Sequence, residues 1–191
     1  VFGSSAFNGA INIVTKHEKR TGARLSAEGG SFGTWGVNGR VSVATGAVTN
    51  SVSGGYRQSD GGTLHSDFKR RQMFYQGDLA SQHIDLQWQV GLSSQDFGAN
   101  TFYSAKFNDQ FEATRRYLTS LSGTIKPFDT DWLTLVPQLY WHRDYDHYQL
   151  IRGKEGAAAG ENYHRTDVYG GGLTANLRWL LGTTSVGADI R

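Results

Sequence analysis

The residues whose types and spacing most suggest chemistry lie at positions 142–148, which read His-Arg-Asp-Tyr-Asp-His-Tyr. Successive side chains of an extended strand point to opposite faces, so His142, Asp144 and Asp146 share one face. His147 lies on the other. Nitrogen and carboxylate ligands of this kind bind transition metals. No metal-site spacing accompanies them, and a strand that meets water carries the same residues, so we predict no metal site and no cofactor.

The sequence lacks the motifs that accompany nucleophilic catalysis and phosphate binding. Ser, His and Asp all occur, but no G-x-S-x-G elbow places a serine between a strand and a helix. The glycine-rich runs at 29–33 and 170–172 open no helix, which a phosphate-binding loop requires. Glycine beside strands also eases tight hairpins and bulges. The sequence has no cysteine, which excludes disulfides, zinc–thiolate sites and cysteine nucleophiles. We predict that the chain is not an enzyme.

Composition narrows the classes of protein further. The 191 residues include 25 glycines, and 13% are aromatic although only 38% are hydrophobic. This aromatic content argues against disorder. No apolar run reaches the ~18–20 residues of a membrane-spanning helix. The 19 basic residues are scattered among 17 acidic ones, so we predict no nucleic-acid partner.

Apolar and polar residues alternate with period two along most of the chain. Even-numbered residues from Ile84 to Leu92 are apolar, whereas odd-numbered residues from Asp85 to Gln95 are polar or glycine. This pattern is typical of a strand with one apolar face. It predicts an all-β chain of nine strands and no helix. The strands are expected at 23–29, 35–43, 51–57, 72–80, 84–95, 111–126, 133–141, 167–179 and 185–191.

The connections alternate in length after a tight first link at 29–34. Short turns are expected near 45–50, 81–83, 127–131 and 181–184, and long polar loops near 59–71, 97–110 and 148–163. Short turns at one end and long loops at the other are typical of an antiparallel up-and-down transmembrane β-barrel. Aromatic residues near strand ends agree with interfacial girdles. An antiparallel β-sandwich also alternates apolar and polar residues and is the alternative fold.

The first twenty residues are glycine-rich and then form a compact apolar run. They resemble the end of the plug domain in TonB-dependent outer-membrane receptors, which reads YGS-x-A-x-G-G-x-I-N-I-x-T-K. Phe replaces the first aromatic residue and Ala10 replaces the second glycine of that motif. The matching residues are Phe2, Gly3, Ser4, Ala6, Gly9, Ile11, Asn12, Ile13, Thr15 and Lys16. The segments 28–34, 54–61 and 97–106 resemble hairpins and loops of the same receptors, of the cobalamin and iron-complex type.

The resemblance implies a fragment of a 22-stranded barrel in the bacterial outer membrane. Residues 1–20 would end the plug domain, and residues 21–191 would form barrel strands one to nine. The implied activity is active uptake of a scarce nutrient such as a ferric siderophore, haem or cobalamin. The implied partners are the lipid bilayer, that metal chelate or cobalamin, and the TonB complex through an upstream plug. A secreted or surface β-sandwich that binds carbohydrate, and a passive porin, are the alternative functions.

Two groups of candidate site residues follow. Loops on a rigid scaffold commonly carry binding residues. The ligand-binding candidates in the expected outer loops are Phe102, Tyr103, Lys106, Arg152 and Lys154. In a barrel the polar strand face lines the lumen. The lumen-facing charged candidates are Arg24, Glu28, Arg40, Arg57, Asp85 and Arg178.

Overall fold

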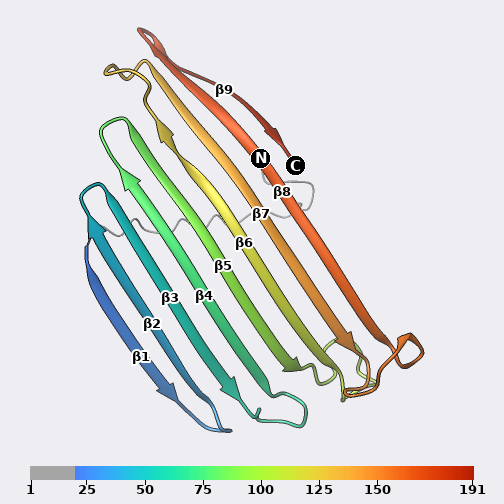
Figure 1. Cartoon of the computed structure of the whole chain (residues 1–191). Helices are drawn as coiled ribbons and strands as arrows, with labels where there is room; N and C mark the ends of the chain where they lie inside the picture. The colour runs from blue at the N-terminus through green and yellow to red at the C-terminus, as the bar shows by residue number, and fades with distance from the viewer. Residues whose placement is uncertain (1–19) are drawn as a thin grey trace.

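A computed structural model describes residues 20–191 as one antiparallel sheet in which each strand pairs with the next in sequence (Figure 1). The strands are β1 (Gly22–Gly29), β2 (Trp35–Thr45), β3 (Val48–Ser59), β4 (Phe68–Ala80), β5 (Ile84–Gly98), β6 (Phe111–Ile125), β7 (Leu133–Gln149), β8 (Glu161–Trp179) and β9 (Gly182–Ile190). A short 3-10 turn, η1 (Ala157–Ala159), lies between β7 and β8. The all-β prediction and all nine predicted strands are confirmed. The plug-like motif at the start of the chain lies outside the described residues.

Most strands are longer than the sequence pattern indicated, and β7 and β8 exceed their predicted bounds by the most. β7 continues to Gln149 where an end at 141 was expected, and β8 begins at Glu161 where 167 was expected. Apolar alternation marks only the part of a strand with one apolar face. The backbone ladder does not depend on side-chain type, so it continues through the charged segment and pairs Tyr148 with Asn162.

After the tight first link, the longer connections lie at one end of the sheet and the shorter ones at the other, as predicted. Linkers at 30–34, 60–67, 99–110 and 150–160 lie at one end of the sheet, the loop end, and linkers at 46–47, 81–83, 126–132 and 180–181 lie at the other. The β2–β3 turn is shorter than expected. Gly46 adopts a φ of 59°, which permits a two-residue hairpin and lets β3 begin at Val48.

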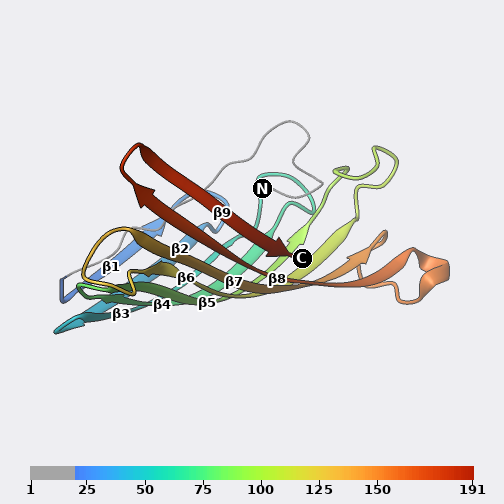
Figure 2. The same ribbon diagram turned by 90° about the horizontal axis from the view of Figure 1, so that it is seen from above.

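The strand register separates an apolar face from a polar face. Val41, Val52, Tyr75 and Val90 occupy directly opposed positions on one face, whereas Ser42, Ser51, Gln76 and Gln89 occupy the next row on the other. Val41 is 53% exposed, yet Ser51 is 3% exposed and Gln76 is 2% exposed. In these rows the polar side chains are therefore less exposed than the apolar ones, as is expected when a sheet curves toward its polar side. Figure 2 shows this curved, open sheet.

The described residues form one layer. Ala99 is the buried hydrophobic residue among them, at 3% exposure, so they hold no ordinary apolar core. A β-sandwich needs two packed sheets, and these residues supply one. Among residues 20–191 the sheet is not closed into a barrel, because β1 and β9 are its edges and pair there with β2 and β8 alone. Within residues 20–191, no helix has the length and apolarity to cross a membrane.

Candidate functional site

Three loops from different hairpins bind one another at the loop end. The guanidinium of Arg152 makes two hydrogen bonds to the carboxylate of Asp67, of 2.7 and 3.0 Å. The Arg152 amide donates to the Asp109 carbonyl at 2.8 Å, and the imidazole of His65 lies 3.4 Å from the Asp109 carboxylate. The hydrogen bonds and charge of Arg152 hold the pKa of Asp67 below its usual value. We call these three loops, 60–67, 99–110 and 150–160, the loop cluster.

Gln110 organises the loop between β5 and β6. Its side chain is completely buried. The side-chain amide donates to the carbonyls of Ser104 at 3.0 Å and Phe107 at 2.7 Å. Its oxygen accepts from the Tyr103 amide and the Tyr148 hydroxyl, each at 3.2 Å. These four hydrogen bonds stabilise a loop that has no backbone ladder. They also satisfy both ends of the buried amide group, which offsets the cost of removing it from water.

Aromatic rings form an exposed group beside Gln110. The ring of Tyr103 meets Phe102 at 4.8 Å and Tyr148 at 5.3 Å between centroids, both edge to face. Phe102 is 75% exposed and Tyr103 is 52% exposed. The Tyr103 hydroxyl donates to the Glu112 carboxylate, and burial and this carboxylate raise the pKa of Tyr103. Glu112 and Tyr148 are paired in one row of the polar face, so the aromatic group lies at the loop end of that face.

The loop between β7 and β8 is fixed by the carboxylate of Glu161. This carboxylate accepts hydrogen bonds from the amide of Gly156 at 2.7 Å, the side chain of Gln149 at 3.1 Å and the hydroxyl of Tyr163 at 2.9 Å. His147 Nε2 lies 2.7 Å from the same carboxylate. The Gly156 amide first, and then His147, lower the pKa of Glu161 to about 2. The loop therefore keeps its shape while Glu161 is ionised.

The six candidate charges on the strands all lie on the polar face, in separate groups. Glu28 and Arg57 form an ion pair of 2.7 Å near the loop end. Arg24 and Arg40 are directly opposed on β1 and β2, and the Arg40 guanidinium lies 3.4 Å from the Ser51 hydroxyl. The remaining two candidates are on β5 and β8 at the turn end, far from the first four along the strands. These two are Asp85 and Arg178.

The loop candidates are also divided. Tyr103 and Phe102 belong to the exposed aromatic group, and Arg152 bridges two loops. Lys106 and Lys154 are exposed loop residues. The structure thus brings Phe102, Tyr103 and Arg152 into one loop cluster, with the two lysines at its surface.

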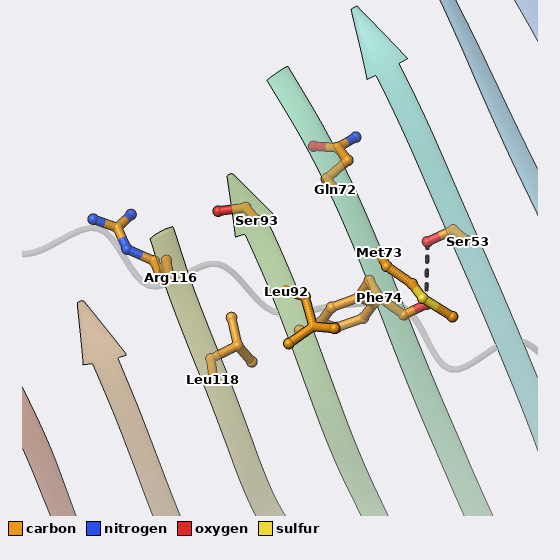
Figure 3. A pocket seen from close by; sticks show the side chains of 9 residues that line it. Ser53, Gln72, Met73, Phe74, Leu92, Ser93, Arg116 and Leu118 are labelled. Carbon is orange, nitrogen blue, oxygen red and sulfur yellow. Dashed lines mark hydrogen bonds between the residues drawn. The ribbon is translucent and has the colours of Figure 1, made fainter. Parts of the chain in front are cut away.

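The polar face also carries an apolar hollow of about 290 Å³ (Figure 3). Phe74, Gly91 and Leu118 are directly opposed on β4, β5 and β6. A Cβ atom at Gly91 would lie 2.7 Å from Leu118 Cγ and 3.2 Å from Phe74 Cδ2, so glycine makes room for both side chains. Ser53 and Arg116 lie at the rim of the hollow. Part of the polar face therefore presents apolar surface to whatever occupies that side.

The His142–Tyr148 segment lies inside β7 and its acidic groups have cationic or imidazole partners. Asp144 pairs with Arg116, and Asp146 lies 3.5 Å from His164. In the part of the chain from residue 20 onward, no three His, Asp or Glu side chains gather in a way that would hold a metal ion.

Sequence reasoning missed the residues that shape the loop cluster. Asp67, Gln110, Glu112 and Glu161 were assigned no role, because each acts through a partner that no local motif identifies. Asp67 and Arg152 are 85 positions apart in the sequence. Only the register of β3 to β8 brings them together.

Comparisons with protein-family models, curated proteins and solved structures gave no match to this chain.

Proposed function

We propose that this chain is part of an outer-membrane β-barrel that takes up a scarce, bulky nutrient such as a ferric siderophore, haem or cobalamin. In the complete barrel, further strands would pair with the free edges of β1 and β9. A free strand edge otherwise templates pairing with other chains.

The observation that carries the proposal is the apolar face of β8. Residues facing this side from Tyr169 to Trp179 are aromatic, glycine or aliphatic. Tyr169 is 68% exposed and Trp179 is 54% exposed, although both are large aromatic residues. Ten residue steps extend roughly 33 Å along a strand, or about 25 Å in height at a tilt near 40°. That is the height of the lipid-facing band of such barrels, with an aromatic residue at each border.

The chemistry of the loop cluster supports a bulky, partly aromatic ligand. Phe102 and Tyr103 offer exposed ring surface, Glu112 accepts a hydrogen bond from Tyr103, and Arg152 of the same loop cluster is paired with Asp67. Phe102, Tyr103 and Arg152 lie on loops that are hydrogen-bonded to one another, so the binding surface is formed before the ligand arrives. In this proposal the polar face, including the Glu28–Arg57 pair, lines the lumen.

A passive porin is the second candidate, because it shares the apolar face and the loops. The plug-like motif ending at Lys16 favours the receptor, since a porin has no plug domain. A carbohydrate-binding β-sandwich lacks its second sheet in the described residues.

Uptake measurements on cells that make the full-length protein test the proposal. We expect the protein in the outer-membrane fraction. We also expect one of three labelled probes, a ferric siderophore panel, haemin or cyanocobalamin, to be bound by cells with or without TonB but imported only with TonB. Import that is independent of TonB would establish the porin, and recovery in the soluble fraction would overturn both membrane functions.

A further inference from the structure

Two carboxylates lie beside the exposed aromatic group at the loop end of the polar face. Glu112 on β6 is directly opposed to Tyr148 on β7, and Asp146 lies two residues before Tyr148 on the same face. Diagonal neighbours on one face of a sheet are roughly 7–8 Å apart, so a single group can lie between Glu112 and Asp146. We call these two carboxylates and the rings of Phe102, Tyr103 and Tyr148 the anionic corner.

Glu112 forms no ion pair with a lysine, arginine or histidine of residues 20–191. Its carboxylate instead accepts a hydrogen bond from the Tyr103 hydroxyl. Burial first, then this hydrogen bond and the charges of Glu112 and Asp146, raise the pKa of Tyr103 above its usual value. The Tyr103 ring is therefore a neutral phenol in a region of negative potential.

The charge of Asp146 is only partly offset by its neighbours. Its Oδ2 lies 3.5 Å from His164 Nδ1, whereas Arg116 on the adjacent strand pairs with Asp144. Asp146 Oδ1 is buried and accepts no hydrogen bond from the described residues. Buried polar atoms normally have a hydrogen-bond partner, and buried charges are stable only when they are paired. A positive group bound beside Asp146 would offset this charge.

The opposite side of the same face is basic. The register places Arg57 on β3 and Arg70 on β4 in the same row as Asp146 on β7. Arg57 pairs with Glu28, and Arg70 makes no ion pair within residues 20–191. Three strand spacings separate β4 from β7, which is roughly 14 Å along the sheet. A positively charged part of a ligand is therefore attracted toward β6 and β7 and repelled from β3 and β4.

The rings of the anionic corner are open to such a group. Phe102 is 75% exposed and Tyr103 is 52% exposed. An ammonium over an aromatic ring is attracted by the electron density of the ring face. Carboxylates add charge-assisted hydrogen bonds to the same ammonium. The two kinds of side chain together favour an organic cation over a neutral or anionic group.

We propose that the anionic corner binds a protonated amine of the transported nutrient, which is then a ferric siderophore with a free ammonium group. The ammonium lies between Glu112 and Asp146 and contacts the ring of Tyr103. Haem carries two carboxylates and cobalamin carries a phosphate, and the corner would repel both groups. This inference rests on the uptake proposed above and names the ligand class for the same loop cluster.

Binding to the full-length protein in non-ionic detergent tests the proposal, with two iron chelates as probes. Ferrioxamine B carries a free protonated amine, and its N-acetyl derivative keeps the chelate without that charge. A hydrogen bond to a charged group contributes about ten- to a hundred-fold in affinity, so ferrioxamine B should bind at least about ten-fold more tightly than the acetylated chelate. In Glu112→Gln with Asp146→Asn this ratio should fall below about three-fold.

The matched control is Asp96→Asn with Glu155→Gln, which also removes one aspartate and one glutamate from the loop end. Asp96 shares its face of β5 with Val90 and Leu92, on the other side of the sheet, and Glu155 is exposed in the β7–β8 loop. This control should keep the ten-fold preference for ferrioxamine B. Circular dichroism of both double variants shows whether the sheet is intact.

The outcomes separate this inference from the transport proposal. Equal affinity for the two chelates, binding of neither, or the same loss of preference in the control would disprove the ammonium site. TonB-dependent import of haemin or cyanocobalamin would in that case leave the transport proposal standing. Conversely, the expected preference in the purified protein together with import that is independent of TonB would support the ammonium site and refute the receptor.

Discussion

Replacing Gln110 should release the loop between β5 and β6 without unfolding the sheet. The buried side chain makes four hydrogen bonds, two as donor and two as acceptor. A net contribution of about 0.5–1 kcal/mol for each bond gives roughly 2–4 kcal/mol for the closed loop. Each 1.4 kcal/mol changes an equilibrium constant about ten-fold. The lower bound of about 2 kcal/mol therefore makes the open state of the loop at least about twenty-five-fold more populated in Gln110→Ala.

Hydrogen exchange followed by mass spectrometry in detergent provides the assay. The amides of Phe102, Tyr103 and Phe107 are hydrogen-bonded inside this loop and should exchange faster by that factor. Gln110→Leu keeps most of the volume and separates hydrogen bonding from packing. Gln95→Ala is the control, because Gln95 makes no hydrogen bond with its side chain among the described residues. Unchanged exchange in residues 99–110 would refute the reasoning.

Three other perturbations test other parts of the sheet. In Gly77→Ala the new Cβ would lie 2.1 Å from Trp88 Cε2, so we expect a loss of about 1–3 kcal/mol and a shifted tryptophan emission. Gly29→Ala, with nothing within 4 Å, is the control for thermal unfolding in detergent. Acidification should loosen residues 150–160: the pKa of Glu161 is lowered to about 2 from 4.5, so its stabilisation holds above pH 4.5 and is lost from pH 4.5 to 2. A rate of proteolysis within residues 150–160 that stays constant from pH 4.5 to pH 2 would contradict this expectation. Arg152→Lys cannot keep both bonds of the bridge, so cleavage of residues 60–67 should rise, and an unchanged rate would show that the bridge is dispensable.

The strand prediction succeeded because one face of each strand is apolar. From Ile84 to Leu92 the alternation follows directly from side chains that point to opposite faces. The prediction ended too early in β7, where the apolar alternation stops near Trp141 but backbone pairing continues to Gln149. Hydrophobic pattern reports burial or lipid exposure, and it does not report hydrogen bonding.

The candidate site was predictable only in part. Exposed aromatic and basic loop residues identified Tyr103 and Arg152 as candidates, because loops of such composition commonly bind ligands. The buried Gln110, which holds that loop together, has no signal in the sequence, since glutamine is usually exposed.

The sequence by itself determined the nine strands, the alternation of short and long connections and the polarity of the two faces. All three depend on local spacing, which each strand carries independently of its neighbours. The tertiary structure decided which side chains meet. Register joins Asp67 to Arg152 and sets Arg71, Arg115 and Arg165 in one row. Those meetings depend on strand pairing across the sheet, where a shift of one residue would send each side chain to the opposite face.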